Sequence, residues 1–294
     1  MNFQRYLSAK RTVDERALNR RVEQRLGEEL AERRRTDPLN VLEVGAGVGS
    51  AALRLLDRRW LPDRVTYTAL DIDERNVAAA RERLPPRAAA LGYAVRRAGD
   101  RFVLSRGRRR VEVEFRAADA FEFLAETDAM WDLVVAQAFA DLVDPADALA
   151  AFRDALAPGG LVYCPITFDG ETILEPVADA EFEARLLDAF HRHLDRSGDS
   201  RAGRHLLSLA ADAGDEGDVL AAGGSDWVVR PRGEAYPADE AYFLDCIVEM
   251  VGSAVRAESA LDDRRLSAWV ARRREQVEDA ELVYVAHQLD LLIR

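Results

Sequence analysis

Residues 41–50 of the chain read VLEVGAGVGS, an apolar run that passes directly into three closely spaced glycines. The run is typical of a buried strand, and the glycines permit a tight turn and a close approach of a ligand to the backbone. A helix that begins after such a turn presents free N–H groups. The dinucleotide fingerprint G-x-G-x-x-G is not met, because Gly49 comes one residue early and Ser50 stands where the third glycine is expected. The stretch indicates a ligand site without specifying the ligand.

Apolar strand-like runs alternate with helical segments around and after this turn. The runs typical of strands are residues 40–44, 65–70, 111–115, 131–135 and 161–166, and the segments typical of helices are residues 50–58, 74–84, 120–126 and 144–156. Such alternation favours a parallel sheet covered by helices on both faces, with right-handed connections. We therefore predict a doubly wound α/β domain with a mainly parallel sheet.

The flanking segments predict further elements. Residues 12–35 have near-helical apolar spacing, and Thr12 and Glu15 form a T-x-x-E capping box. The second half predicts a helix at 178–195, a strand at 226–230, two helices within 238–279 and a final strand at 281–293, with polar residues 196–225 in between. We expect one structural domain in three parts: a helical segment (1–38), a binding core (39–170), and the last two strands with a helical lobe (171–294).

Residues 93–110, the Arg-rich hairpin, interrupt the alternation with two short runs that meet at Gly99-Asp100. The segment carries Arg96, Arg97, Arg101, Arg106, Arg108, Arg109 and Arg110. Charge runs are usually solvated faces, so we interpret the hairpin as a solvated extension of the sheet. The alternative is a docking patch for an acidic partner or substrate.

Composition and charge narrow the class of protein. The net charge of −12 argues against a protein that tracks a nucleic-acid backbone, because such proteins carry a basic surplus. No apolar run reaches the roughly 20 residues that span a bilayer, and residues 1–10 lack an apolar signal segment. Cys164 and Cys246 lie too far apart for a C-x-x-C pair. We expect a cytoplasmic protein with reduced cysteines and with neither a membrane nor a nucleic acid as partner.

An acidic residue ends the strand that follows the glycine turn. Asp71 comes directly after the run 65–70, and a carboxylate at the end of the second strand can accept both hydroxyls of a ribose. Asp73 and Glu74 follow at once and are interpreted as a helix cap and a dipole partner. The glycine turn and Asp71 together predict a ligand that contains a nucleoside.

Five motifs in this order resemble class I S-adenosylmethionine-dependent methyltransferases. They are Glu43 with the glycine turn, Asp71, Ala117-Ala118-Asp119-Ala120, Trp131-Asp132-Leu133-Val134-Val135, and FRDALAPGGL at 152–161. The resemblance covers about residues 40–166, and the order and spacing make it far more specific than any one motif. It implies an enzyme with a seven-stranded, mainly parallel sheet, an inserted helical lobe and S-adenosylmethionine as cofactor.

The resemblance also implies roles for single residues. The methionine part of the cofactor would lie on the glycine turn, the ribose on the acid of the second strand, and the adenine beside the ends of the second and third strands. The residues are Gly45, Ala46, Gly47 and Gly49 for the methionine, Glu43 for its amino end, Asp71 for the ribose, Ile72, Asp119 and Ala120 for the adenine, and Gln137 for the sulfonium side. Tyr6 and Lys10 are further candidates, because an N-terminal helix often closes over the cofactor in this family.

Departures from related patterns argue against two subclasses. Nucleic-acid amino-methyltransferases carry an N-P-P-Y-like motif after the fourth strand, where this chain has Ala136-Gln137-Ala138-Phe139. Metal-dependent catechol-type enzymes place acidic residues at that strand end, whereas Asp141 and Asp144 come later and are assigned to loop and cap positions. We therefore expect no metal.

The sequence assigns no catalytic base, because methyl transfer from a sulfonium can proceed largely by alignment of nucleophile, methyl group and sulfur. His287 lies among apolar residues of the final strand and is interpreted as a satisfied core histidine, and Trp227 as a packing residue. Tyr163 and residues 167–169 lie at the exit of the fifth strand, where open α/β sheets bind ligands, so they are expected to face the substrate.

The acceptor is expected to be a small molecule, bound by residues 167–225 and 231–280. One alternative is methylation of a macromolecule, RNA or protein, that docks on the Arg-rich hairpin. Another is a non-catalytic S-adenosylmethionine-binding protein with a regulatory role, and a nicotinamide dehydrogenase is the least supported. The sequence indicates neither the methylated atom nor the oligomeric state.

Overall fold

The computed structural model describes residues 1–32, 37–212, 219–258 and 261–294. One sheet lies at its centre in the order β3-β4-β5-β2-β1-β6-β7-β10-β8, with β9 paired to β10 outside this path. The strands are β1 (Leu39–Val44), β2 (Arg64–Asp71), β3 (Ala94–Ala98), β4 (Arg101–Arg106), β5 (Arg109–Ala117), β6 (Trp131–Val135), β7 (Leu156–Glu175), β8 (Val219–Gly224), β9 (Trp227–Val229) and β10 (Val283–Ile293).

The strand directions confirm the predicted doubly wound, mainly parallel sheet. β1 pairs in parallel with β2 and β6, β2 with β5, and β6 with β7, whereas β10 is antiparallel to β7 and β8. Seven strands, β5-β2-β1-β6-β7-β10-β8, form the expected core, and the hairpin β3–β4 and β9 extend it. The carboxyl ends of β1, β2, β5 and β6 therefore meet at one edge of the sheet.

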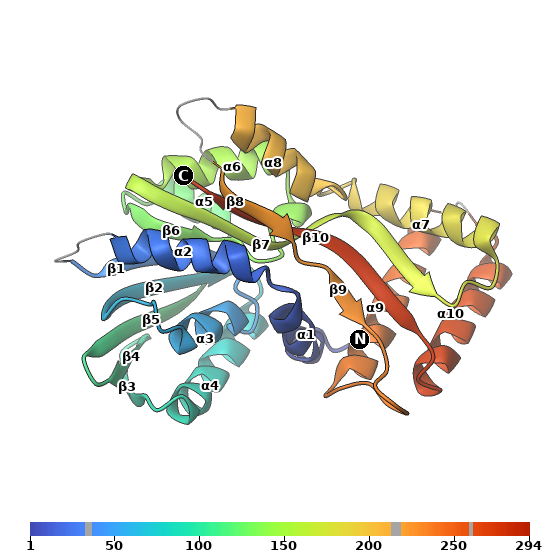
Figure 1. Cartoon of the computed structure of the whole chain (residues 1–294), viewed down its shortest axis with the longest axis horizontal. Helices are drawn as coiled ribbons and strands as arrows, with labels where there is room; N and C mark the ends of the chain where they lie inside the picture. Colours follow the sequence, from blue (N-terminus) through green and yellow to red (C-terminus); the bar gives the residue numbers. More distant parts are fainter. Residues whose placement is uncertain (33–36, 213–218, 259–260) are drawn as a thin grey trace.

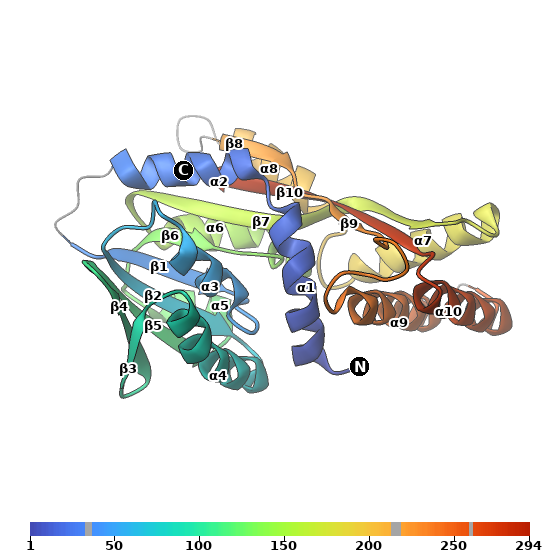
Figure 2. The same ribbon diagram turned by 60° about the horizontal axis from the view of Figure 1, so that its bottom comes forward.

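Helices cover both faces of this sheet (Figures 1 and 2). They are α1 (Phe3–Ala17), α2 (Arg20–Glu32), α3 (Ser50–Asp57), α4 (Glu74–Ala90), α5 (Ala120–Glu126), the 3-10 turn η1 (Ala140–Leu142), α6 (Pro145–Asp154), α7 (Ala180–Leu194), α8 (Ala202–Asp212), α9 (Glu240–Glu258) and α10 (Asp263–Glu278). Buried side chains of α2, α3 and α4, such as Leu26 and Leu55, pack on one face. Those of α5, α6 and α8, such as Phe152 and Leu206, pack on the other. Among the described helices, none has both the length and the apolar character needed to cross a membrane.

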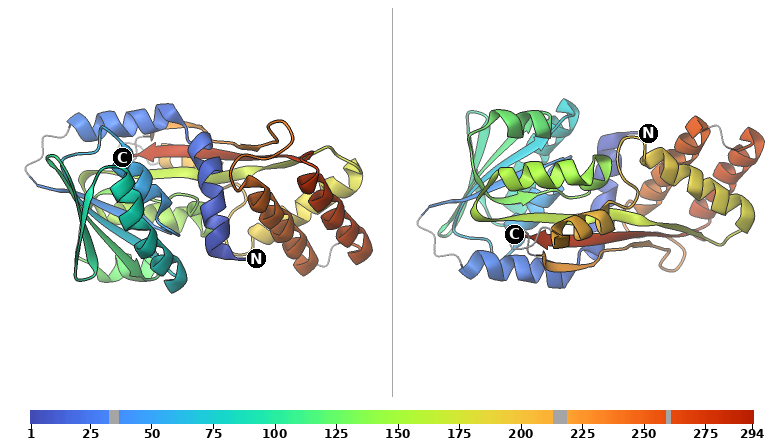
Figure 3. Two further views of the ribbon diagram at one scale, coloured as in Figure 1. Left: turned by 90° about the horizontal axis from the view of Figure 1, so that it is seen from below. Right: turned by 90° about the horizontal axis from the view of Figure 1, so that it is seen from above.

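β7 and β10 continue past the sheet core as a paired ribbon that carries α7, α9 and α10, here called the helical lobe (Figure 1). The lobe has its own cluster of buried apolar side chains, to which α1 contributes Tyr6 and Val13. Figure 3 shows α1 between the sheet core and the lobe. Because α1 touches α4 on one side and α9 on the other, it can form a wall for any pocket between them.

A buried ion pair joins α7 to α10 within the lobe. Arg273 is 1% exposed, and its Nη2 lies 2.5 Å from the Glu183 carboxylate. The same guanidinium donates to the carbonyl oxygens of Leu174 and Pro176 and to Gln276 Oε1. The pair thus fixes the end of the β7 ribbon against both helices.

Replacing Glu183 by alanine is expected to lower the free energy of unfolding by about 3 kcal/mol, because the variant leaves the Arg273 charge buried without its partner. Urea denaturation followed by circular dichroism measures this loss. Glu181→Ala, an exposed carboxylate in the same turn of α7, is the matched control and should cost less than about 1 kcal/mol. Equal losses for the two variants would contradict the structural role of the pair.

The N-terminal prediction of one helix from a cap at Thr12 is wrong. Asn2 caps α1, its side chain accepting from Arg5 N–H, and the chain breaks at Leu18 before α2 begins. Thr12 lies inside α1 and donates its hydroxyl to Glu240 of α9 at 2.8 Å. The T-x-x-E pattern therefore reflects a contact between helices, and residues 33–35 of the predicted helix lie outside the described residues.

Two further boundaries differ from the prediction. α4 does not end at Leu84 but continues through two prolines to Ala90, since Leu84 and Ala88 both pack into the core beside the sheet. The polar segment 196–225 contains α8 and β8. Because the segment is rich in glycine and charged residues, its sequence does not indicate a helix. The buried residues of α8, Leu206 and Ala210, pack on the same face of the sheet as α5 and α6.

Candidate functional site

A pocket of about 550 Å³ lies at the carboxyl ends of β1, β2, β5 and β6. Seven of the ten residues predicted for ligand binding line it: Gly45, Gly47, Asp71, Ile72, Asp119, Ala120 and Gln137. Phe3, Tyr6, Leu7 and Lys10 of α1 form a second wall, and Trp227 and Met250 belong to a third. The sheet edge, the N-terminal helix and the segment leading to the lobe therefore enclose one space, here called the strand-end pocket.

The glycine turn has the left-handed backbone that only glycine adopts easily. Gly45, Gly47 and Gly49 have φ angles of 65°, 54° and 78°. A side chain on Gly45 would stand 2.6 Å from the ring of Phe139, and one on Gly49 would press on Phe115 and Ala80. Gly49 therefore serves the packing of α3 and α4 on the sheet. Neither Gly49 nor Ala46 is among the residues that line the pocket, and contact of either with a ligand stays a prediction.

Asp71 ties the turn to the start of α4. Its Oδ2 accepts from Gly47 N–H at 2.7 Å, and its Oδ1 accepts from Asp73 N–H at 2.9 Å and from Asn76 Nδ2 at 3.0 Å. A carboxylate offers about four lone-pair positions, so three are used within the chain and one on Oδ2 is left for a ligand. Asp71 can thus accept from one ribose hydroxyl while it holds Gly47 in place.

Ile72 and Asp119 line the pocket just after the ends of β2 and β5. The Asp119 Oδ1 caps α5 by accepting from Phe121 N–H at 2.8 Å and Glu122 N–H at 3.1 Å. Its Oδ2 has no recorded partner within the described chain and is available to an amino group. Ile72 is 74% exposed, which is unusual for so apolar a side chain. A flat aromatic ring laid on Ile72 would cover it.

Gln137 makes one hydrogen bond within the chain through each end of its amide, and its role at the sulfonium stays a prediction. Its Nε2 donates to Asp14 Oδ2 at 3.0 Å, and its Oε1 accepts from Arg54 at 2.5 Å. The other oxygen of Asp14 accepts from Trp227 Nε1 at 2.9 Å, and Lys10 Nζ lies 3.6 Å from Asp14. We call these contacts the Asp14 network, and they hold α1 over the pocket. Burial raises the pKa of Asp14, whereas the charges of Lys10 and Arg54 lower it.

Glu43 lies behind the turn and not among the residues that line the pocket. It is 2% exposed, and its carboxylate accepts from Tyr67 Oη at 2.7 Å. Burial raises the pKa of Glu43 to about 7, against the effect of the Tyr67 hydrogen bond and the Arg54 charge. Any contact with the amino end of a ligand must therefore be indirect, for instance through Arg54 and Gln137.

The raised pKa of Glu43 predicts a pH-dependent stability. Between its ordinary value of 4.5 and about 7 the folded chain holds a proton that the unfolded chain has lost, so stability falls as pH rises through this window. The total effect is roughly 3 kcal/mol. The Glu43→Gln variant can still accept from Tyr67. Its free energy of unfolding, compared with that of the native protein, should be more favourable at pH 8 than at pH 5. Urea denaturation at both pH values tests this, and a gain no larger than that of the exposed-site variant Glu82→Gln would refute it.

Asp141 lines the same pocket and was not predicted as a site residue. It lies in η1, and its Oδ1 is shielded from water without a hydrogen-bond partner. Asp144 is the N-cap of α6, as predicted for a cap position, accepting from Ala146 N–H and Asp147 N–H. The sequence feature that could have indicated Asp141 as a site residue is its position six residues after β6, at the same sheet edge as the glycine turn.

Other residues expected to face a substrate have different roles. Residues 167–169 are not among those lining the strand-end pocket; they lie in β7, where Thr167 and Phe168 pair with Leu289 and Gln288 of β10. Asp169 instead accepts from Arg204 Nε at 2.9 Å. His287 is not a core residue: its side chain is 38% exposed and its Nδ1 lies 2.8 Å from Asp226. Trp227 packs edge-on against Phe243, as expected, and also lines the pocket.

The arginines of the Arg-rich hairpin mostly bind within the chain. Arg101 pairs with Glu114 and Arg110 with Glu112, at 2.9 and 2.8 Å. Arg109 donates to three backbone carbonyls between residues 58 and 61, and Arg106 donates to that of Leu91. These contacts favour the interpretation of the hairpin as a structural extension of the sheet.

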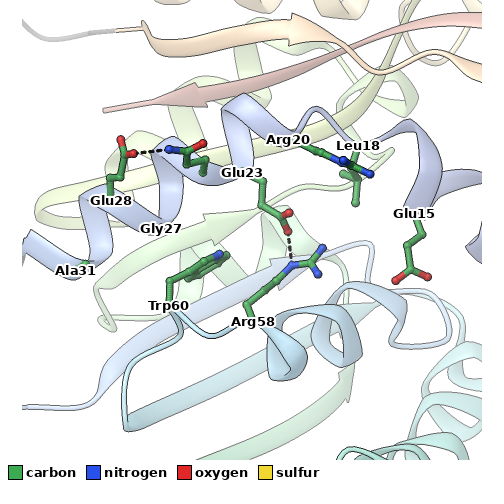
Figure 4. Close-up of a pocket in the computed structure, with 10 residues that line it drawn as sticks. Glu15, Leu18, Arg20, Glu23, Gly27, Glu28, Ala31, Arg58 and Trp60 are labelled. Carbon is green, nitrogen blue, oxygen red and sulfur yellow. Dashed lines mark hydrogen bonds and ion pairs between the residues drawn. The ribbon is translucent and has the colours of Figure 1, made fainter.

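A wider cavity of about 760 Å³ lies beneath α2 (Figure 4). Figure 4 shows Glu23 pointing toward Arg58, 2.6 Å away, with Trp60 below Gly27. A second side-chain pair, Gln24 with Glu28, spans one turn of α2. The polar side chains that line the cavity beneath α2 are thus largely hydrogen-bonded to one another, and no strand ends at this cavity. We therefore assign the functional site to the smaller strand-end pocket.

Comparison with known proteins gives matches to the sheet core. A family model described as "Methyltransferase domain" matches residues 42–164, from β1 into β7. Solved structures with a similar chain path include the SAM-dependent methyltransferases from Thiobacillus denitrificans (17% identity, 95% of this chain and 92% of that chain, TM-score 0.44) and Geobacter sulfurreducens (16%, 95% and 92%, 0.43), both in complex with S-adenosyl-L-homocysteine. At these TM-scores the structural likeness adds no argument. No curated protein sequence matches the chain.

Proposed function

We propose that the chain, whose residues 42–164 match a family model described as "Methyltransferase domain", transfers a methyl group from S-adenosylmethionine to a small-molecule acceptor. The observation that carries the proposal is the strand-end pocket. It brings the glycine turn, the Asp71 carboxylate and the Asp119 carboxylate together at one edge of the sheet. Open α/β sheets bind ligands at this edge.

The chain offers a suitable group for each part of the cofactor. Asp71 would accept from a ribose hydroxyl, the free Oδ2 of Asp119 from the adenine amino group, and Ile72 would pack on the adenine ring. Gly45 and Gly47, which leave the backbone uncovered, would let the methionine part lie against the turn. Glu43, Ala46, Gly49 and Gln137 would act indirectly, by holding the turn and α1 in position.

S-adenosylmethionine supplies an electrophilic methyl group on a cationic sulfur, and that charge is lost during transfer. A pocket that excludes water favours this loss of charge. Phe3, Leu142, Trp227 and Met250 provide apolar surface around the pocket. The Asp14 network holds α1 in place as a cover, so the reacting groups can be aligned away from solvent.

A small acceptor is favoured by the size and walls of the pocket. The volume of about 550 Å³ falls within the 300–1,000 Å³ that is usual for small-molecule sites. The macromolecular alternative depended on the Arg-rich hairpin, whose arginines mostly bind within the chain. Residues of α1, β9 and α9 add a wall through which the acceptor would be chosen.

The function is tested by incubating the protein with S-adenosylmethionine that carries a deuterated methyl group, together with a cellular metabolite extract. We expect S-adenosylhomocysteine to form in step with a deuterated product in the small-molecule fraction. Asp71→Ala serves as the inactive control. Deuterium found only in RNA or protein would contradict the small acceptor, and bound cofactor without turnover above the control would contradict catalysis.

A further inference from the structure

Asp141 is a carboxylate in the strand-end pocket for which the chain provides no complete set of partners. Its Oδ1 is shielded from water and has no hydrogen-bond partner. No ion pair within the described residues includes Asp141, and the N-cap of α6 is Asp144. A buried, unsatisfied carboxylate oxygen is costly to leave in place, so its retention at a pocket wall indicates a ligand.

Several charged and polar groups face Asp141 from the neighbouring elements. Tyr6 and Lys10 approach from α1, Asp199 from the segment before α8, and the Phe168 backbone amide from β7. Burial raises the pKa of Asp141, with Asp199 adding to the rise, while backbone amides and the Lys10 ammonium lower it. Lys10 lies against Asp14 at 3.6 Å, so its charge is shared within the Asp14 network.

The position of Asp141 relates it to the acceptor and not to the nucleoside. The nucleoside groups proposed above lie on the turn and on the ends of β2 and β5. Asp141 comes after β6, next to Phe139, whose ring fills the space that Gly45 leaves open. Leu142, Trp227 and Met250 line the same pocket. A ligand atom beside Asp141 would therefore lie past the glycine turn, where the methyl group is transferred.

We propose that Asp141 binds the methyl acceptor and takes the proton of its nucleophile, an N–H or O–H group on a largely apolar small molecule; this inference rests on the function proposed above. In the step, the N–H or O–H bond breaks toward the Asp141 carboxylate. The electron pair of the nucleophile forms the bond to the methyl carbon, and the pair of the breaking carbon–sulfur bond remains on sulfur as a neutral thioether. The proton stays on Asp141 until the product leaves and water enters the pocket.

The test needs no knowledge of the acceptor. Sinefungin resembles S-adenosylmethionine but has a carbon bearing an amino group in place of the sulfur and its methyl group, so it places an ammonium where the acceptor meets the methyl group. Calorimetry gives the affinities of the native protein for sinefungin and for S-adenosylhomocysteine. We expect the native protein to prefer sinefungin, because a hydrogen bond to a charged group stabilises the complex.

Asp141→Asn is expected to reduce this preference about tenfold or more, with the affinity for S-adenosylhomocysteine unchanged within about twofold. Asp144→Asn is the matched control, since it makes the same change of charge three residues away and asparagine still caps a helix. In the native protein the preference should also decline as pH falls through the raised pKa of Asp141, because the neutral carboxyl no longer attracts an ammonium.

Two results would overturn the inference while leaving the proposed function intact. The preference for sinefungin could be the same in Asp141→Asn as in Asp144→Asn, which would place Asp141 away from the methyl position. Alternatively, Asp141→Asn could weaken both ligands equally, which would place its carboxylate at the methionine ammonium. Failure of the native protein to bind S-adenosylhomocysteine would overturn the proposed function and this inference together.

Discussion

Replacing Asp71 by alanine is expected to weaken the binding of S-adenosylhomocysteine at least 100-fold, or about 3 kcal/mol. The variant loses the acceptor for a ribose hydroxyl, a hydrogen bond to a charged group that is worth about 1.5–3 kcal/mol. It also releases Gly47 N–H and Asn76 Nδ2, which Asp71 now holds at 2.7 and 3.0 Å. The glycine turn then no longer has one fixed conformation, and binding must restore it.

Isothermal titration calorimetry at a fixed pH measures this loss. The control is Asp144→Ala, which removes a helix cap of the same chemistry at α6, outside the residues that line the pocket. The control should lose about 1 kcal/mol of stability and bind the ligand within about threefold of the native protein. Native-like affinity in Asp71→Ala, with the fold intact by circular dichroism, would show that the nucleoside lies elsewhere.

Replacing Asp14 by alanine is expected to lower the free energy of unfolding by about 3 kcal/mol and the affinity for S-adenosylhomocysteine about tenfold. Asp14 is 4% exposed and joins Lys10, Gln137 and Trp227. Its removal leaves the buried Lys10 ammonium without a partner, and the buried Trp227 N–H and the half-buried Gln137 N–H without an acceptor; breaking such a network is strongly destabilising. The ligand binds less well because α1 no longer covers the pocket.

Glu15→Ala is the neighbouring control on the same helix. Glu15 pairs with Arg11 at the surface, and surface pairs contribute about 0–1 kcal/mol. Urea denaturation separates the two variants, and calorimetry follows the ligand. Asp14→Asn keeps an acceptor for Trp227 and should fall between Asp14→Ala and the native protein. If Asp14→Ala were as stable as Glu15→Ala, the network would not be what holds α1 in place.

The central sheet and half of the pocket could be predicted because their signals are local. A strand, a glycine turn and a helix start lie within residues 41–50, and Asp71 follows its own strand directly. The end of a parallel strand has a fixed place in a doubly wound sheet. The sequence therefore placed Gly45, Gly47, Asp71 and Asp119 at one edge before their contacts were known, and the family match covers the same residues.

The other half of the pocket could not be predicted, because it depends on contacts between distant segments. The direction of the Gln137 amide is set by Asp14, 123 residues away, and by Arg54, 83 residues away. The Trp227 indole is set by the same Asp14, 213 residues before it. In the sequence, nothing distinguishes Asp141 from other aspartates between a strand and a helix. Its burial depends on α1 and on the segment before α8, which enclose it in the folded chain. Such walls are decided by tertiary packing, which no local pattern encodes.

A crystal structure of the protein with S-adenosylhomocysteine tests the central claim most directly. We expect the ribose against Asp71 Oδ2, the adenine between Ile72 and Asp119, and the methionine part on Gly45 and Gly47, with the sulfur directed toward Asp141. Density for the ligand in the cavity beneath α2, or a strand-end pocket that stays empty at saturating ligand, would contradict it.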